Sequence, residues 1–441
     1  MLTFDTELRE AQQMVLRWPE KGKLQSVTVI RDVFAKLTFY METVEKIDQP
    51  DRDSFYLCAS GKLGNFFSGT VYWDKPKKGK RTPQPVLDII KDLRHYWDTK
   101  EGIEFYLSER AIAKKAWVQQ AEQQPVWPYE ETIAGISPKV VTFYSFKGGM
   151  GRTTTLAAVA LQMVRKGKNV MMVDTDIEAP GLASLFFDES RIEKGVLDYL
   201  IEHPLNPEQG VARYVQDVTE PALLREEDGH LYLMPAGKVD GGYLQKLARI
   251  DYQDHRNGAL REALEGLLKE IRREYAIDYI LIDARAGFHD MGGIVAAQLP
   301  HGVVLFGNGS RQSWEGLALV LQTISAGHRD IMPVALADCL GEVQGGPLYL
   351  EQRERFLQKA YTVCLDYYYE NDVPGMEAQN VAHMPVSLPY NSLLRGDVLL
   401  FSNGSPQEDS QVKAIADVLC GADYKKVLDR VEMWFGEGEL V

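Results

Sequence analysis

The sequence predicts an α/β fold, a doubly wound and mostly parallel sheet that follows a small α+β domain. Three observations support this prediction. Apolar strand-like runs alternate with helix-like runs from about residue 140 onward. A glycine-rich loop joins the first of these strands to a helix, and acidic residues follow two other strands. Alternation of this kind specifies a parallel sheet that binds its ligand at the carboxyl edge of the strands.

Residues 1–118 are expected to form the α+β domain, in which no catalytic constellation is evident. Hydrophobic periodicity predicts helices over 7–18, 86–97 and 112–118, and strands over 24–30, 36–44, 55–59 and 65–73. A basic loop at 75–81 follows the last of these strands and is interpreted as a solvated turn. Residues 119–138 contain three prolines and a glycine, which predicts a linker.

The sheet domain is expected over residues 139–441. Its predicted strands are 140–146, 169–173, 231–234, 277–283, 303–306, 333–337 and 385–388. A last helix over 423–435 has apolar residues at helical spacing and a polar face with balanced charges. Because membrane-surface helices normally carry a basic polar face, we expect this helix to pack on its own domain.

A phosphate-binding loop joins the first strand of the sheet to its helix. Glycines let successive backbone N–H groups converge on phosphate oxygens, and the following helix adds its positive N-terminal end. Thr153, which follows Arg152 in the loop, can offer its hydroxyl to a magnesium ion. The predicted nucleotide-binding residues of this loop are Lys147, Gly148, Gly149, Met150, Gly151, Arg152, Thr153 and Thr154.

The basic residues of this loop are unusual. An ordinary phosphate loop has a lysine immediately before the hydroxyl residue, whereas Arg152 occupies that position and Lys147 stands at the start. A guanidinium can clamp phosphate oxygens with two hydrogen bonds, but it does not replace an ammonium point charge atom for atom. We therefore expect nucleotide binding to be retained and turnover to be slow.

The lysine-first arrangement resembles the deviant Walker A motif, K-G-G-x-G-[KR]-[ST]-T, of the ParA/MinD-type ATPases, and in particular a subgroup with arginine as its normal residue. In this family the early lysine reaches the nucleotide of the partner subunit. The resemblance, which runs from about residue 138 to about 420, therefore implies an ATP-dependent homodimer with Lys147 acting across the interface.

Two further segments resemble the family. Asp174-Thr175-Asp176 ends the second strand, and Asp283 ends a buried strand four residues before Gly287. The resemblance implies that Asp176 orients the attacking water, that Asp283 holds magnesium through water together with Thr153, and that Gly287 belongs to the second switch. It assigns catalytic roles to Asp176, Lys147 and Arg152, and adds Asp174 and Gly287 to the nucleotide-binding residues.

Four other predictions concern the edges of the site. Residues 387–390 resemble the family segment that lines the base, which adds Pro389 to the predicted nucleotide-binding residues, and residues 308–313 are a second loop for the base. Arg285 could stabilise charge near the γ-phosphate, but pairing with an acid of the partner subunit is the favoured interpretation. His289 is expected to be a surface residue of the loop that contains Arg285.

Composition excludes several function classes. The four cysteines are far apart and form no C-x-x-C pair, which argues against disulfides, zinc and iron–sulfur clusters. Residues 1–136 have 20 Lys and Arg against 20 Asp and Glu, which leaves 29 against 43 for residues 137–441. The acidic half disfavours nonspecific nucleic-acid binding. With no apolar run of about 20 residues and no signal-peptide pattern, we expect a cytoplasmic protein without stable membrane insertion.

Together these observations predict a cytoplasmic, ATP-dependent, dimerising molecular switch. It is expected to bind ATP and Mg²⁺, to hydrolyse ATP slowly, and to control an unidentified protein partner or effector. Two alternatives remain open. The first is a nucleotide-gated scaffold that does not hydrolyse ATP, and the second is a DNA-partitioning motor of the ParA type.

Overall fold

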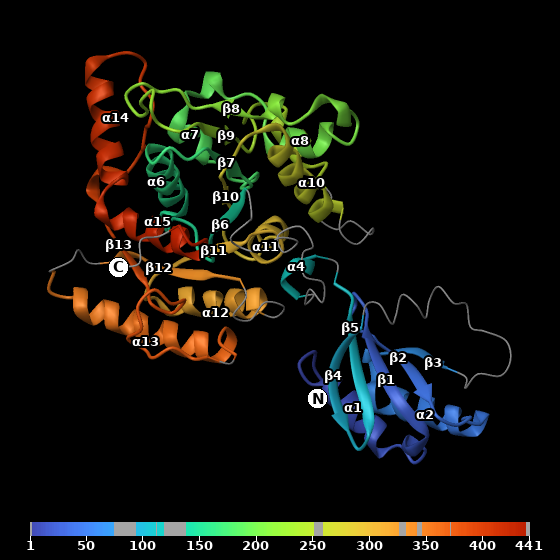
Figure 1. The fold of residues 1–441 in the computed structure, drawn as a ribbon. Helices are drawn as coiled ribbons and strands as arrows, with labels where there is room; N and C mark the ends of the chain where they lie inside the picture. The colour runs from blue at the N-terminus through green and yellow to red at the C-terminus, as the bar shows by residue number, and fades with distance from the viewer. Residues whose placement is uncertain are drawn as a thin grey trace. The chain divides into compact units, whose positions relative to one another are not determined.

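The computed structural model divides into two compact units, Met1–Ile112 and Ala113–Val441 (Figure 1). It describes residues 2–74, 94–111, 113–118, 138–250, 259–325, 332–341, 346–370 and 372–437. Most of the predicted linker and the whole basic loop at 75–81 lie outside the described residues. Each unit has its own hydrophobic core.

In the residues that the structure describes, the N-terminal unit is a five-stranded sheet in the order β3-β2-β1-β5-β4, with two helices packed on it. Strand β1 is antiparallel to β2 and parallel to β5. Phe55 of α2 and Val15 of α1 are fully buried in the core beneath the sheet. The elements are α1 (Glu7–Arg17), β1 (Leu24–Arg31), β2 (Leu37–Thr43), α2 (Gln49–Leu63), β3 (Phe67–Trp73), β4 (His95–Lys100) and β5 (Ile103–Glu109).

Three predictions for this unit need correction. The predicted strand at 55–59 is part of α2, because Phe55, Ala59 and Leu63 recur every four residues and form one buried helical face. The predicted helix at 86–97 ends in a strand, since β4 begins at His95; its earlier part lies outside the described residues. Strand β5 was not predicted, although its buried residues alternate with exposed ones.

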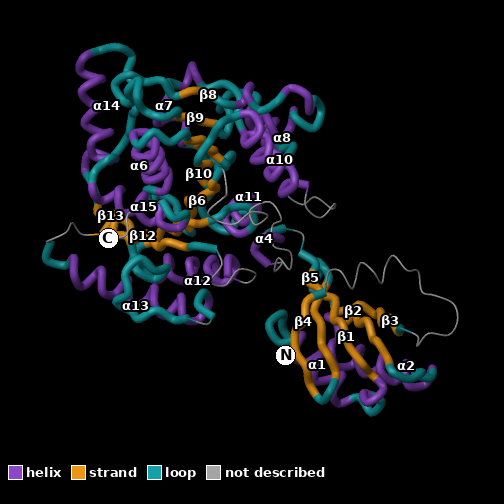
Figure 2. The backbone as a smooth tube through the Cα atoms, viewed as in Figure 1, coloured by secondary structure: helices purple, strands orange, loops and turns teal. Residues whose placement is uncertain are grey.

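The larger unit contains an eight-stranded sheet in the order β13-β12-β11-β6-β10-β7-β9-β8 (Figure 2). Among the described strands of this sheet, only the short β8 is antiparallel to its neighbour. The predicted parallel sheet is thus confirmed, with all seven predicted strands in place. The strands are β6 (Lys139–Ser145), β7 (Val170–Asp174), β8 (Gln216–Asp217), β9 (Leu231–Met234), β10 (Tyr279–Asp283), β11 (Gly302–Gly307), β12 (Val334–Gly341) and β13 (Val386–Pro389).

Helices cover both faces of this sheet, as a doubly wound fold requires. One face is covered by α6 (Arg152–Arg165), α7 (Leu182–Phe186), α14 (Pro406–Leu419) and α15 (Ala422–Trp434). The other is covered by α8 (Val196–Glu202), α9 (Tyr243–Leu247), α10 (Ala259–Glu274), α11 (Asp290–Ala297), α12 (Arg311–Ser325) and α13 (Tyr349–Tyr367). The short α4 (Lys115–Val118) also belongs to this second core.

Register brings the predicted acids together at one edge of the sheet. Strand β10 lies between β6 and β7, and Asp283 is paired in register with Asp174 on one side and Phe143 on the other. The carboxyl ends of β6, β7 and β10 therefore converge where the phosphate loop begins.

Short 3-10 segments of the described chain lie at Lys21–Lys23, Gly64–Phe66, Glu189–Arg191, Pro207–Gln209, Ala212–Tyr214 and Ser392–Leu394.

The C-terminal helix α15 packs on its own unit, as predicted. Val427, Leu428 and Val431 are buried in the core that also contains α6. Among the described residues, the structure contains no helix whose length and apolar character would let it cross a membrane.

Candidate functional site

The phosphate loop runs from the end of β6 to the start of α6. Gly149 and Gly151 have φ angles of 73° and 77°, a left-handed conformation that is costly for residues with a side chain. Helix α6 begins directly after Gly151, so that the unpaired N–H groups of its first turn face the loop. A pocket of about 460 Å³ lies at this loop. It is lined by Ser145, Gly148, Gly149, Met150, Gly151, Arg152, Thr153, Thr154, Asp176, Ala179, Arg285 and Ala286.

Arg152 connects the loop to both acidic segments. Its Nε donates to Oδ1 of Asp283 at 2.5 Å, and its Nη2 donates to Oδ2 of Asp176 at 3.2 Å. Its Nη1 donates to Oγ of Ser145 at 3.3 Å. The neighbouring Thr153 donates its hydroxyl to Oδ2 of Asp283 at 2.6 Å. The three motifs predicted from the sequence therefore meet, and the unusual arginine is the residue that joins them.

The site is buried and strongly charged. Side-chain exposure is 11% for Arg152, 10% for Asp176 and 2% for Asp283. Burial raises the pKa of Asp176, although the guanidinium of Arg152 opposes this rise. Burial disfavours the charge on Arg152, but Asp283 and Asp176 outweigh burial and raise the pKa of the guanidinium. The arginine and the acids therefore depend on one another for their charged states.

Asp174, the last residue of β7, supports the loop that carries Asp176. Its carboxylate accepts backbone N–H bonds from Asp176, Gly181 and Leu182 at 3.0–3.3 Å. Burial and the nearby Asp283 raise the pKa of Asp174 to about 8, against the effect of the donated N–H bonds. Asp174 does not line the pocket. Its contacts hold the loop that carries Asp176, and its predicted role in nucleotide binding stays a prediction.

The second switch, which we define as residues 285–290, closes the site on the other side. Arg285 forms an ion pair with Glu178 at 2.7 Å and approaches Oδ1 of Asp176 at 3.7 Å. Nε2 of His289 lies 2.5 Å from Glu178, and burial lowers the pKa of His289. Within this single chain the acid beside Arg285 is Glu178, and pairing with an acid of a partner subunit stays a prediction.

Three other predicted residues, Gly287, Lys147 and Pro389, do not line this pocket. Gly287 has a φ of 77°, and its N–H donates to the carbonyl of Ser145 at 3.2 Å. Lys147 is partly buried at the start of the loop and does not line the pocket. Pro389 ends the edge strand β13, three strands from β6, and does not line it either.

Sequence reasoning missed three small residues of the pocket, Ser145, Ala179 and Ala286. Each lies within three residues of a predicted site residue, and this proximity is the only signal in the sequence that could have found them. Ser145 is the last residue of β6, and its hydroxyl accepts a hydrogen bond from Arg152.

The donor set fits a magnesium ion only together with a nucleotide. No group of three His, Cys, Asp or Glu side chains suited to a metal occurs among the described residues. Magnesium usually binds one or two carboxylates or hydroxyls and takes its other ligands from water and substrate phosphates. Thr153 and Asp283 are adjacent and supply that minimal pair.

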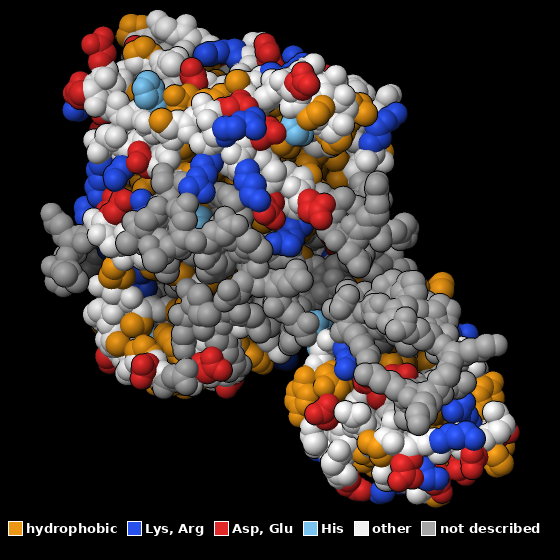
Figure 3. Space-filling view, turned by 45° about the vertical axis from the view of Figure 1, so that its right-hand side comes forward, with side chains coloured by type: hydrophobic (Ala, Val, Ile, Leu, Met, Phe, Trp, Pro, Cys, Tyr) orange, Lys and Arg blue, Asp and Glu red, His pale blue; other side chains and the backbone are white. Residues whose placement is uncertain are grey.

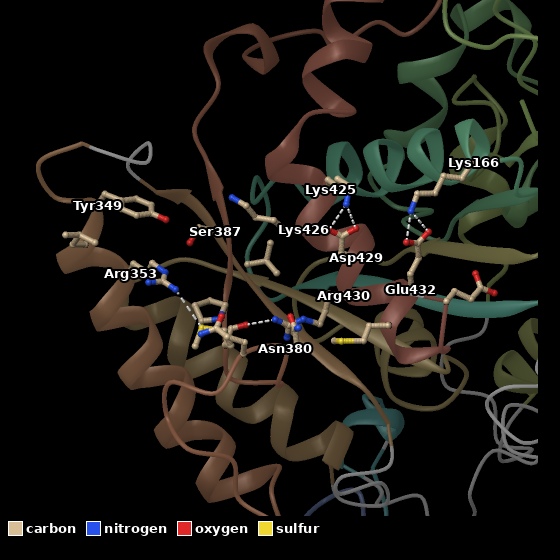
Figure 4. Close-up of a pocket in the computed structure, with 17 residues that line it drawn as sticks. Lys166, Tyr349, Arg353, Asn380, Ser387, Lys425, Lys426, Asp429, Arg430 and Glu432 are labelled. Atoms are coloured by element: carbon tan, nitrogen blue, oxygen red, sulfur yellow. Dashed lines mark hydrogen bonds and ion pairs between the residues drawn. The ribbon is translucent and has the colours of Figure 1, made fainter. Parts of the chain in front are cut away.

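A larger cavity, of about 1030 Å³, lies among α13, β13 and α15 (Figure 4). It contains no residue of the phosphate loop. Two of its cations are paired within the chain, Lys166 with Glu432 and Lys425 with Asp429. The smaller pocket at the loop is therefore the candidate nucleotide site, because the motif residues converge there.

Comparisons with known proteins match the part of the chain that contains this site. A family model described as an AAA domain matches residues 138–331. The septum site-determining protein MinD of Bacillus subtilis is 28% identical over 151 residues, which cover 34% of this chain and 46% of MinD. The chloroplastic MinD homologue of Arabidopsis thaliana is 31% identical over 169 residues, 37% of this chain and 43% of that protein. The matched part thus spans less than half the length of these relatives.

Among solved structures, a complex of Cyanothece McdA with ATP aligns with 70% of this chain and 100% of its own. Its sequence identity is 14% and its TM-score is 0.46.

Proposed function

Because residues 138–331 form a ParA/MinD-like P-loop ATPase domain, we propose that this protein is an ATP-dependent, dimerising molecular switch. It would bind ATP with Mg²⁺, hydrolyse ATP slowly, and control a partner protein through association and dissociation of its dimer. The observation that carries this proposal is the convergence of Arg152, Thr153, Asp176 and Asp283 on one pocket.

Each residue has a role that follows from its position. The backbone N–H groups of residues 148–154 would hold the phosphates, and Thr153 with Asp283 would hold Mg²⁺, which neutralises phosphate charge when bound. Asp176 would orient the attacking water. Lys147, which stands outside the pocket of its own chain, would reach the nucleotide of a second subunit.

Arg152 gives a reason for slow turnover. Its guanidinium bonds Asp176 and Asp283, so the arginine must release both acids before they can serve water and metal. Breaking an ion pair that is about nine-tenths buried has a substantial cost. The same contact is the specific observation in favour of the alternative function, a scaffold that binds ATP and dimerises without hydrolysing it.

A DNA-partitioning motor is less well supported. Lys and Arg side chains are interspersed with Asp and Glu on the face of the larger unit in Figure 3. The net charge of −14 also opposes nonspecific binding to a phosphate backbone. Salt-sensitive binding to duplex DNA would favour the motor over the switch. We place the switch in the cytoplasm as part of the same proposal.

The proposal is tested by measuring mass in solution with light scattering, with and without Mg-ATP, while phosphate release is followed. The wild type should dimerise only with Mg-ATP, Asp176→Ala should trap the dimer, and Lys147→Ala should abolish it. Lys413→Ala, which changes an exposed lysine of α14, is the matched control and should behave as the wild type.

The outcomes separate the candidate functions. A dimer that forms with ATP but releases no phosphate would replace the slow ATPase by the scaffold. A mass that ignores ATP, without phosphate release, would contradict both.

A further inference from the structure

We propose that residues 113–118, called here the switch clasp, position the second switch and couple it to the N-terminal unit. This inference rests on the proposed nucleotide switch and names the route by which the N-terminal unit would regulate it. The clasp lies outside all the sequence motifs of the nucleotide site. Its contacts with the switch are made within the larger unit.

Trp117 is the centre of the clasp. Its indole Nε1 donates to the backbone carbonyl of His289 at 2.7 Å, and its ring lies 5.2 Å from the ring of Phe288. The ring also lies 5.4 Å from Tyr144, whose hydroxyl donates to the carbonyl of Gly287 at 2.8 Å. Trp117, which is 9% exposed, therefore helps to hold three successive residues of the switch.

Lys114 holds the other end of the switch. Its backbone N–H donates to Oδ1 of Asp290, and its Nζ lies 3.0 Å from Oδ2 of the same carboxylate. Asp290 is the first residue of α11 and is buried. A carboxylate at this position is favoured by the helix dipole, and the lysine offsets the cost of burying its charge. Lys114 thereby ties the start of α11 to the clasp.

Helix α11 is built to accept the clasp closely. Gly293 lies against it: an added Cβ would come within 2.8 Å of Nε1 of Trp117 and 2.9 Å of Cβ of Ala116. Glycine inside a helix costs about 1 kcal/mol relative to alanine, so its presence here needs a compensating contact. On its other side the clasp meets α12, where Oγ1 of Thr323 lies 3.3 Å from the carbonyl oxygen of Trp117 and 3.0 Å from that of Leu319.

The position of the switch matters for the nucleotide site. Arg285 and His289 both contact Glu178, and Arg285 also approaches Asp176. A shift of the clasp would move His289 and Asp290 directly, and would carry Arg285 relative to Asp176. The clasp residues are therefore positioning residues, because they act on the site through the switch.

The chain connection to the N-terminal unit is short. Arg110 donates its N–H to the carbonyl of Arg31 at 2.9 Å, directly after β5. Three residues lie between Arg110 and Lys114 in the sequence. In this proposal a partner bound at the end of β5 would act on the clasp through the covalent connection, and nucleotide would act on β5 in return.

Hydrogen exchange of the full chain, read by mass spectrometry, tests both halves of the proposal. Trp117→Phe keeps an aromatic ring and removes the N–H donor. Without nucleotide it should speed exchange of amides 287–293 by about twofold to tenfold, the range expected for one hydrogen bond. Trp434→Phe, a tryptophan of α15 on the opposite face of the sheet, should leave these amides unchanged.

The coupling is tested with a Gly-Ser-Gly-Ser segment inserted between Arg110 and Ala111. Mg-ATPγS should protect residues 147–155 and change exchange in β5 of the wild type. The insertion should leave the protection of 147–155 and the exchange of 287–293 intact, but abolish the response of β5.

The outcomes distinguish the inference from the function on which it rests. Failure of Mg-ATPγS to protect residues 147–155 of the wild type would contradict the nucleotide switch. Normal protection there, with unchanged exchange of 287–293 in Trp117→Phe, would overturn the clasp. A β5 response that persists after the insertion, or that the wild type lacks, would overturn the coupling.

Discussion

Replacing Arg152 by alanine should destabilise the larger unit in the absence of nucleotide. The variant leaves Asp176 and Asp283 buried without the guanidinium that bridges them, at side-chain exposures of 10% and 2%. Removing one partner of a buried ion pair costs about 3–5 kcal/mol. At about 2 °C per kcal/mol for a unit of this size, the melting temperature should fall by roughly 6–10 °C.

Magnesium and pH give this prediction further readouts. Millimolar Mg²⁺ without nucleotide should stabilise Arg152→Ala more than the wild type, because the freed carboxylates can bind the cation. The difference in stability between the variant and the wild type should be largest at neutral pH. It should shrink as the pH falls through the pKa of Asp176, since a protonated acid no longer needs a counter-ion.

Calorimetry of the wild type and Arg152→Ala, with Lys147→Ala as a control, tests this prediction by measuring their melting temperatures. The control removes a positive charge from the same loop at a residue outside the pocket, and should change stability by less than about 1 kcal/mol. If Arg152→Ala unfolds within about 1 kcal/mol of the wild type, or if Mg²⁺ stabilises both proteins equally, the bridging role of the arginine is refuted.

Four further predictions concern other residues of the larger unit. Gly316→Ala should cost about 1–3 kcal/mol and weaken nucleotide binding, because a Cβ there would lie 2.0 Å from Cδ1 of Phe146, next to the loop. Gly266→Ala, in α10 with no atom within 4 Å of the added Cβ, should instead stabilise by about 0.5–1 kcal/mol in urea unfolding. Burial raises the pKa of Asp338 to about 7, so this carboxyl group binds a proton more tightly in the folded protein than in the unfolded protein. The stability of the protein should therefore fall as the pH rises from about 4 to about 7. Asp338→Asn should gain most above that range in urea titrations at several pH values, and an equal gain at all pH values would contradict the assignment. Ser405→Ala should cost about 1 kcal/mol in the same assay, because it removes the side-chain cap of α14, and no loss would show that the cap is replaced by water.

The parallel sheet could be predicted because its signals are local. Strands that are buried on both faces read as short apolar runs, and seven such runs alternate with helices. The N-terminal unit was harder to predict. Its α2 carries aromatic residues that also favour strands, and β5 is a short run whose alternation was not used.

The site was predicted to the level of its motifs, and the sequence also identified the exchange of lysine for arginine at position 152. It could not show what Arg152 bonds. The guanidinium meets Asp176 and Asp283, 24 and 131 residues further along the chain, and only the register of β6, β7 and β10 brings those acids to it.

The sequence alone therefore determined the class of the fold, the phosphate loop and the acids that serve it, because each is written in neighbouring residues. Only the tertiary structure decided that Arg285 lies beside Glu178 and that Trp117 contacts the second switch. Trp117 and His289 are 172 residues apart, and no periodicity or motif links them. Their contact depends on how α4, α11 and α12 pack on one face of the sheet, which is set by the burial of the whole core.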